Sequence, residues 1–272
     1  MRRLIIRPGG IGDCILSLPA MEHLREEYTE VWVPSALAPL IGFAEARGIA
    51  STGLDLLGLP NVEPPAGLVA KLASFDSIVS WYGANRVEFR EQVRALELPF
   101  QFLDALPEAG AKIHAADFFL QQAGGDGVAV PRIECECRTR GDFAVIHPFS
   151  GSARKNWPLE RFREVAARLP MPVRWCAGPE EVFAGATRFE NLHELGCWLA
   201  GASIYIGNDS GITHLAAAVG TPVVAIFGPT DPAVWAPRCE RASVVSGTLE
   251  QIGVDQVMQA VAGRVPNPGT IF

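Results

Sequence analysis

The chain has 272 residues, of which 49% are hydrophobic and 19% charged, and its formal net charge at pH 7 is −7. This composition supplies ample material for a folded core and excludes disorder as the main state. The acidic balance argues against a general nucleic-acid binder, which needs a basic surface. The length allows two α/β lobes or one large barrel.

No segment is expected to cross a membrane or to act as a signal peptide. The longest apolar stretch, residues 215–227, is interrupted by Gly220 and Pro222 and is shorter than the roughly 20 residues that a bilayer requires. The apolar run after the basic N-terminus stops at Arg7 and Pro8, too early for a secretory leader.

The cysteines show no CxxC spacing and no zinc-type ladder. They are Cys14, Cys135, Cys137, Cys176, Cys197 and Cys239. Their scatter predicts reduced thiols in a cytosolic protein. Cys135 and Cys137 are the closest pair and would share a face of an extended segment, but no metal or redox role is expected from this pattern alone.

In the first half of the chain, short apolar runs alternate with amphipathic stretches. Strands are predicted at 4–6, 31–33 and 77–81, and helices at 15–27, 87–96 and 114–123. Residues 124–127 are turn formers, and helical periodicity is lacking up to about residue 141. We therefore expect an N-terminal lobe over residues 1–130.

A second alternating series forms the expected C-terminal lobe over residues 131–272. Strands are predicted at 143–147, 173–177, 203–206, 222–227 and 242–246, and helices at 159–169, 192–200, 210–219 and 254–262. Such alternation is typical of parallel sheets covered by helices on both faces. The fold class is thus α/β, with two doubly wound lobes and a ligand cleft between them.

The glycine-rich turn after the first strand contains Gly9, Gly10 and Gly12, which let a ligand approach the backbone closely. It fails the dinucleotide fingerprint, because Ile15 stands where the third glycine is required. An oxidoreductase is therefore disfavoured. Asp13 follows at the mouth of a helix, either as an N-cap or as a catalytic carboxylate held ionised by the helix dipole.

The strand that ends at His147 runs into a loop with small, hydroxyl-bearing and basic residues, including Ser150 and Lys155. Such residues at the carboxyl end of a strand suit an anion, and Lys155 offers a mobile charge for a diphosphate. The alternative is a solvated loop with a stray pair of basic residues.

The segment Asn208-Asp209-Ser210-Gly211 connects a predicted strand to a predicted helix of small residues. Free backbone N–H groups at that helix start, with Ser210 and Gly211, predict a cradle for phosphate oxygens. His214 lies one turn inside, on the same face as Ser210. The alternative makes Asp209 and Ser210 simple caps and His214 a half-buried structural histidine.

These segments together resemble glycosyltransferase family 9, the ADP-heptose:lipopolysaccharide heptosyltransferases. The resemblance rests on residues 7–13 with 18–19, on 147–150 with 155, 157–158 and 162, on 208–211 with 214 and 216, and on 227–232 with 235. It implies a GT-B architecture, in which two Rossmann-like lobes face one cleft. The C-terminal lobe would hold the nucleotide sugar, and the N-terminal lobe, short for this family, would hold the acceptor.

The resemblance also implies roles for individual residues. Asp13 matches the general base, and the backbone of Gly9, Gly10 and Gly12 forms the loop beside it. The residues that match donor-binding positions are Ser150, Lys155, Asp209, Ser210, Gly211 and His214. In the segment 178–181, Glu181 is preferred over Glu180 as the carboxylate that holds the ribose hydroxyls.

The expected activity is an inverting, metal-independent transfer of a sugar, by family default heptose from ADP-heptose, to a saccharide such as lipopolysaccharide core. The chain has no DxD sequence, so neither a metal nor a cofactor is expected. The expected partners are a nucleotide sugar and a saccharide or lipid-linked saccharide. The expected location is cytoplasmic, with at most peripheral contact at the inner membrane face. Alternatives are a nucleotide-sugar-binding protein without transfer activity and a transferase that uses another donor.

Overall fold

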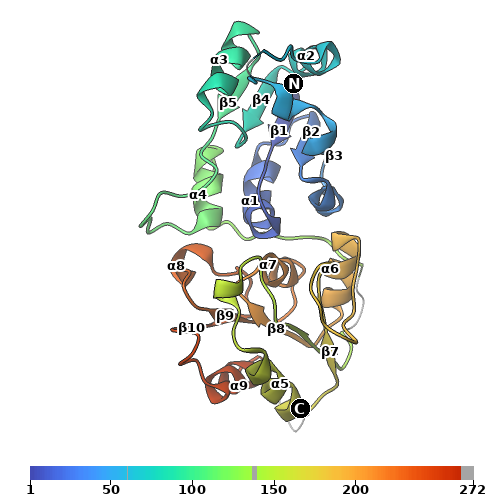
Figure 1. Ribbon diagram of the computed structural model, residues 1–272, viewed down its shortest axis with the longest axis vertical. Helices are drawn as coiled ribbons and strands as arrows, with labels where there is room; N and C mark the ends of the chain where they lie inside the picture. The colour runs from blue at the N-terminus through green and yellow to red at the C-terminus, as the bar shows by residue number, and fades with distance from the viewer. Residues whose placement is uncertain (60, 137–139, 265–272) are drawn as a thin grey trace. The chain divides into compact units, whose positions relative to one another are not determined.

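The computed structural model describes residues 1–59, 61–136 and 140–264 (Figure 1). The chain divides into two compact units. Unit 1 comprises Met1–Ala111 and Ala115–Ala129, and unit 2 comprises Lys112–His114 and the chain from Val130 onward. The division falls one residue before the predicted lobe boundary. Among the described residues, no helix combines the length and the apolar character needed to cross a membrane.

Unit 1 is built on a parallel sheet of five described strands in the order β3-β2-β1-β4-β5. The strands are β1 (Arg2–Ile6), β2 (Tyr28–Val33), β3 (Glu45–Gly48), β4 (Ser77–Ser80) and β5 (Phe100–Phe102). The helices are α1 (Ile11–His23), α2 (Ala66–Ala73), α3 (Val87–Ala95) and α4 (Ala115–Gln122). The strand order reverses between β1 and β4, where doubly wound sheets bind ligands.

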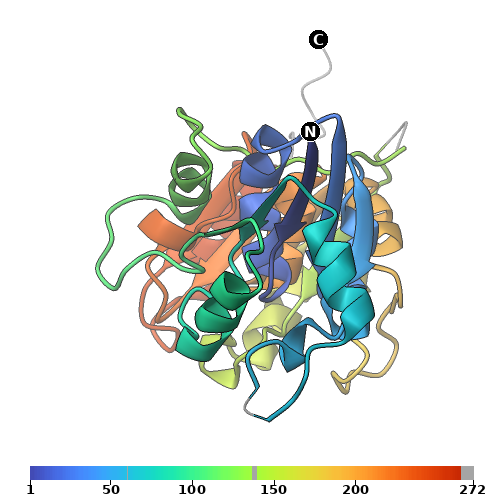
Figure 2. The same ribbon diagram turned by 90° about the horizontal axis from the view of Figure 1, so that it is seen from above.

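Helices cover both faces of this sheet because neighbouring residues of a strand point to opposite sides. Leu4 and Ile6 of β1 join a buried cluster with residues of α2 and α3, which lie on the same side of the sheet (Figure 2). Helices α1 and α4 contribute nothing to that cluster and pack side by side elsewhere (Figure 1).

Unit 2 repeats the plan with the strand order β10-β9-β8-β6-β7, again parallel. The strands are β6 (Ala144–His147), β7 (Val173–Trp175), β8 (Ile204–Asn208), β9 (Val223–Phe227) and β10 (Ala242–Ser246). The helices are α5 (Leu159–Arg168), α6 (Leu192–Ala200), α7 (Gly211–Ala218), α8 (Pro232–Trp235) and α9 (Val254–Ala262). The order reverses between β6 and β8. One core cluster joins these strands to α5 and α9, which lie together in Figure 1.

The two parallel α/β sheets confirm the predicted fold class, and the differences lie in short or edge elements. The edge strands β3 and β5 were not predicted, because their short sequences lack a pattern of their own and they are held by pairing with β2 and β4. Helix α2 was also not predicted. Short 3-10 helices occupy Ser35–Leu40, Ile49–Ser51, Leu54–Leu56 and Ala153–Lys155.

The first helix begins at Ile11, four residues before the predicted start at Ile15. Gly10 is its N-cap, with an extended backbone, and the Asp13 carboxylate accepts a hydrogen bond from the Gly10 N–H at 2.9 Å. Of the two alternatives for Asp13, the one that makes it the N-cap is therefore wrong. Asp13 occupies the third helical position, from which an acidic side chain reaches back to the cap.

Candidate active site

Asn208, the last residue of β8, organises the switch point of unit 2. Its buried side chain accepts a hydrogen bond from the Trp157 N–H at 2.9 Å and donates one to the Pro148 carbonyl at 2.8 Å. Both partners belong to the loop that follows β6, the neighbouring strand. The loop that carries Ser150 and Lys155 is thus tied directly to the start of α7.

Lys155 and Asp209, both predicted donor residues, form an ion pair. The Lys155 Nζ lies 2.7 Å from Asp209 Oδ2 without the angular geometry of a hydrogen bond. The Asp209 side chain is only 6% exposed, whereas that of Lys155 is 35% exposed. A buried carboxylate needs a compensating cation, and the partly exposed ammonium can also turn toward a bound anion.

The start of α7 combines a cap with free helix N–H groups. The Ser210 hydroxyl accepts a hydrogen bond from the Thr213 N–H at 3.3 Å and lies 3.1 Å from the Thr213 hydroxyl. The capping role left open for Ser210 is therefore present. Gly211 is the first helical residue, so its N–H has no partner within the helix. His214 is buried on the same helix, one turn after Ser210.

Glu181 joins the same sheet edge from the segment after β7. Its Oε2 accepts a hydrogen bond from the Gly178 N–H at 2.6 Å and lies 3.0 Å from His147 Nε2. Because a carboxylate only accepts hydrogen bonds, Nε2 of His147 carries the proton. Burial raises the pKa of Glu181, but the hydrogen bonds from His147 and Gly178 outweigh burial and hold this pKa below its ordinary value. Glu180 is exposed.

Ser150 shapes its own loop. Its hydroxyl lies 2.7 Å from both the Ser152 carbonyl and the Asn156 side-chain oxygen. These bonds hold the turn that leads to Lys155 and occupy the single hydroxyl proton. A direct contact of Ser150 with a donor stays a prediction.

In unit 1, Asp13 follows β1 at the switch point of the first sheet. Its Oδ2 is held by the Gly10 N–H, and its side chain is half-buried. Within the described part of the chain, no hydrogen bond reaches Oδ1. Gly9 has a φ of +112°, and a Cβ there would lie 2.9 Å from Asp13 Oδ2. The glycine loop is therefore needed to leave room for this carboxylate. Gly12 lies within the first turn of α1.

Arg7 was not predicted as a site residue. A charged residue directly after a buried strand is the sequence signal that could have singled it out. Arg7 is 1% exposed. Its Nε donates to the Ser17 hydroxyl at 2.9 Å, and another nitrogen donates to the Asp13 carbonyl at 3.3 Å. The guanidinium lies 4.5 Å from the centre of the Phe119 ring. Burial lowers its pKa, and the Asp13 carboxylate opposes that effect. Arg7 thus places a fixed charge behind Asp13.

His147 and Asn208 belong to the sequence patterns of the strand ends, but no role of their own was predicted for them. Both are polar and buried at the ends of otherwise apolar strands. This placement is the signal that could have singled them out, since a buried polar side chain needs partners.

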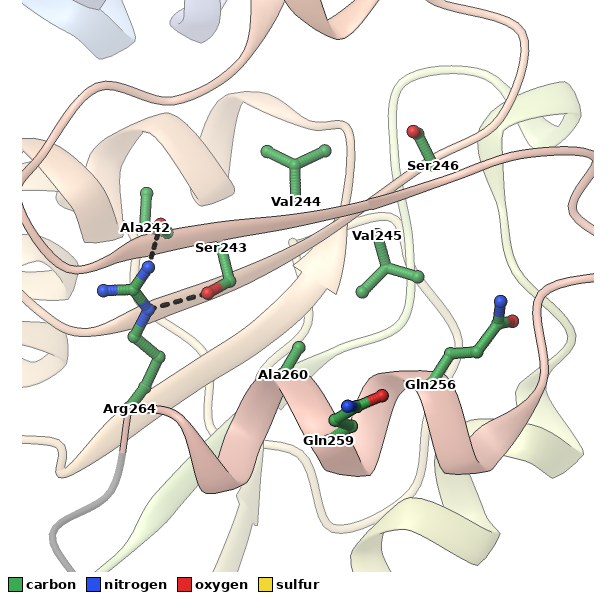
Figure 3. Close-up of a pocket in the computed structure, with 9 residues that line it drawn as sticks. All are labelled: Ala242, Ser243, Val244, Val245, Ser246, Gln256, Gln259, Ala260 and Arg264. Atoms are coloured by element: carbon green, nitrogen blue, oxygen red, sulfur yellow. Dashed lines mark hydrogen bonds between the residues drawn. The ribbon is translucent and has the colours of Figure 1, made fainter.

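A shallow pocket lies along the other side of unit 2, between β10 and α9 (Figure 3). Arg264 closes one end by donating to the Ser243 hydroxyl at 2.6 Å and to the Ala242 carbonyl at 2.8 Å. None of the predicted site residues lines this pocket. It is separate from the candidate site.

Comparison with known proteins connects these residues to one family. The sequence profile of glycosyltransferase family 9 (heptosyltransferase) matches residues 111–264. The chain is 35% identical to lipooligosaccharide heptosyltransferase 2 of Haemophilus influenzae over an alignment 308 positions long, which covers 90% of this chain and 88% of that protein.

Solved structures support the same conclusion at the level of the fold. Escherichia coli heptosyltransferase WaaC with ADP superposes with a TM-score of 0.69 and 18% identity, covering 97% of this chain and 100% of that chain. Escherichia coli ADP-heptose lps heptosyltransferase II gives a TM-score of 0.72 and 16% identity, covering 97% and 98%. The two switch-point sites thus sit in a GT-B fold, and the chain belongs to glycosyltransferase family 9, the heptosyltransferase family.

Proposed function

We propose that this glycosyltransferase transfers heptose from ADP-heptose to a saccharide acceptor of the lipopolysaccharide core type, with inversion and without a metal. The observation that carries the proposal is the Lys155–Asp209 ion pair at the N-terminal start of α7. The choice of donor and acceptor rests on the relatives, which include a lipooligosaccharide heptosyltransferase and a heptosyltransferase solved with ADP.

The donor is assigned to unit 2. The diphosphate binds at the start of α7, where Ser210 and Gly211 present helix N–H groups and the helix dipole favours an anion. Lys155 turns from Asp209 to the diphosphate. His214, on the same helix, is assigned to the donor site as well. Glu181 binds the ribose hydroxyls through Oε1, since its Oε2 is occupied by Gly178 and His147.

Asp13 is assigned the role of general base. It removes the proton from the acceptor hydroxyl while that oxygen attacks the anomeric carbon. The bond from this carbon to the diphosphate oxygen breaks in the same displacement, so the configuration inverts and ADP leaves. A positioned base contributes roughly 10²–10⁴-fold to the rate.

Metal independence is proposed because the protein's own positive groups can face the leaving diphosphate. Lys155 and the helix start provide charge where it develops, which is the most effective form of electrostatic stabilisation. The acceptor is assigned to unit 1, which carries Asp13. A location on the cytoplasmic side, at most peripheral to the membrane, stays a prediction.

Two substitutions test the assignment. Asp13→Asn keeps an oxygen that can accept the Gly10 N–H, so the fold and donor binding should persist while transfer falls at least about 100-fold. Lys155→Ala should weaken ADP binding in calorimetry. The controls are Asp255→Asn and Lys112→Ala, which alter exposed residues outside the site. Near-wild-type turnover by Asp13→Asn would refute the role of the base.

The identity of the donor is tested by titration of the wild-type protein with ADP, UDP and GDP. Binding of ADP alone supports ADP-heptose, whereas binding of UDP alone overturns it. Donor binding with no turnover across saccharide acceptors would favour the alternative of a binding protein that has lost transfer activity.

A further inference from the structure

A cluster of metal-binding side chains lies in unit 2 on helix α6 and on the segment that leads into the second sheet. One donor atom each from Cys135, His193 and Cys197 can be chosen such that all three lie within 4.8 Å of one another. All three residues are half-buried. None of them belongs to the loops that form the candidate donor site. Cys137, the neighbour of Cys135 in the sequence pattern, lies outside the described residues.

Helix α6 supplies two of the three groups. His193 and Cys197 are four residues apart and therefore share one face of the helix, the spacing by which a single helix presents two ligands to one metal. The Cys197 Sγ lies 3.8 Å from His193 Nδ1 and 3.9 Å from Nε2. On a tetrahedral Zn²⁺ with bond lengths of about 2.3 Å to sulfur and 2.0 Å to nitrogen, a sulfur and a nitrogen ligand lie about 3.5 Å apart and two sulfur ligands about 3.8 Å apart.

The orientation of His193 is the second, independent observation. Its Nε2 lies 3.1 Å from the Glu134 carbonyl. A carbonyl can only accept, so Nε2 carries the proton and Nδ1 is the ring nitrogen left with a lone pair for a metal. Metal-bound histidines almost always donate their other N–H to such an acceptor, which fixes the tautomer and the ring.

Cys135 completes the triad from outside the helix. A Cβ added to Gly196 would lie 3.8 Å from the Cys135 Sγ, an ordinary contact distance, so this sulfur lies against the surface of helix α6. Small movements of the cysteine side chain suffice to bring its sulfur to a ligand distance from a shared ion.

We infer that Cys135, His193 and Cys197 form a binding site for a soft divalent metal ion of the Zn²⁺ class. Two thiolates and one imidazole select such ions over Mg²⁺ or Ca²⁺, which prefer oxygen ligands. Three protein ligands leave the fourth tetrahedral position to a water, and the ion joins the segment that enters unit 2 to helix α6. Two residues before Cys135, the Ile133 N–H already holds that segment in place by donating to the Ala218 carbonyl at 3.0 Å. The site is independent of the proposed transfer reaction.

The test uses the untagged, full-length protein, reduced and stripped of metal with a chelator, and titrated with Co²⁺. We expect one equivalent to bind with a thiolate-to-cobalt charge-transfer band in the near ultraviolet and the visible bands of tetrahedral cobalt. Zn²⁺ should displace Co²⁺ and raise the thermal unfolding temperature. Cys197→Ser and His193→Gln should lose the bands, whereas the control Cys239→Ser should retain them.

The wild-type titration alone keeps the inference falsifiable if a variant does not fold. Absence of charge-transfer bands in the wild-type protein would overturn the site, as would bands that persist unchanged in both Cys197→Ser and His193→Gln.

Discussion

Replacing Asn208 by alanine tests how the candidate donor site is held together. The side chain is fully buried and bridges the Trp157 N–H and the Pro148 carbonyl at 2.9 and 2.8 Å. Alanine removes both bonds and leaves two buried backbone groups without partners. Nothing else in the contact between β8 and the loop after β6 needs to change, so the loss is specific to this bridge.

The expected magnitude is set by the desolvation of these two groups. Each unpaired buried donor or acceptor costs about 1–3 kcal/mol. A water that enters the vacated space can restore part of one bond, so Asn208→Ala should lower the free energy of unfolding by about 2–4 kcal/mol. That loss corresponds to a fall of roughly 5–15 °C in Tm. ADP affinity should fall as well, since the loop that carries Lys155 is no longer fastened to α7.

The assay is urea unfolding followed by circular dichroism, fitted to separate transitions where the two units unfold apart, together with ADP calorimetry below the transition. Asn191→Ala is the matched control. Asn191 caps α6 at a half-buried position by accepting from His193 and Glu194, and its loss should cost only about 1 kcal/mol. A change below about 1 kcal/mol for Asn208→Ala, with unaltered ADP affinity, would refute the reasoning.

Two further substitutions probe unit 1. Gly9→Ala should displace the Asp13 carboxylate, because the new Cβ would lie 2.9 Å from Oδ2 at a φ of +112°, and the transfer rate should fall about tenfold or more. In the control Gly10→Ala the new Cβ meets only a 3.7 Å contact, so kcat should fall much less. Equal losses of kcat in a steady-state assay would contradict this. Glu30→Gln should lower the stability of unit 1 by about 2 kcal/mol at pH 7, since the buried Glu30 carboxylate pairs with Lys71 at 2.6 Å. Burial raises the pKa of Glu30, but hydrogen bonds bring it below its ordinary value of 4.5, so this stabilisation is complete above about pH 4.5 and is lost as pH falls through the lowered pKa of the folded state. Wild-type and variant unfolding curves should therefore converge in acid; a constant difference down to full protonation would contradict the assignment.

The layered α/β plan was predictable because buried parallel strands show continuous apolar runs. Val223–Phe227 is such a run, as are residues 204–206, and both are found in central strands. The edge strands of unit 1 do not carry this signal. Glu45–Gly48 is polar and half-exposed, and it becomes a strand only because β2 offers it a partner.

The glycine turn shows where local patterns mislead. Asp is a residue type that is favoured at N-caps, yet Gly10 occupies that position and the Asp13 side chain reaches back to it. Capping depends on backbone angles as well as on residue type. The sequence alone could therefore place Asp13 at a helix start, but it could not decide how the carboxylate is held.

The sequence by itself determined the alternation of strands and helices in both halves of the chain and the chemical types of the residues at the strand ends. Periodicity and turn residues act over a few positions, so they can be read without a fold. Only the tertiary structure decided which of these residues meet. Lys155 reaches Asp209 and His147 reaches Glu181, because parallel strands that are distant in the chain end at one edge of a sheet and bring their loops together.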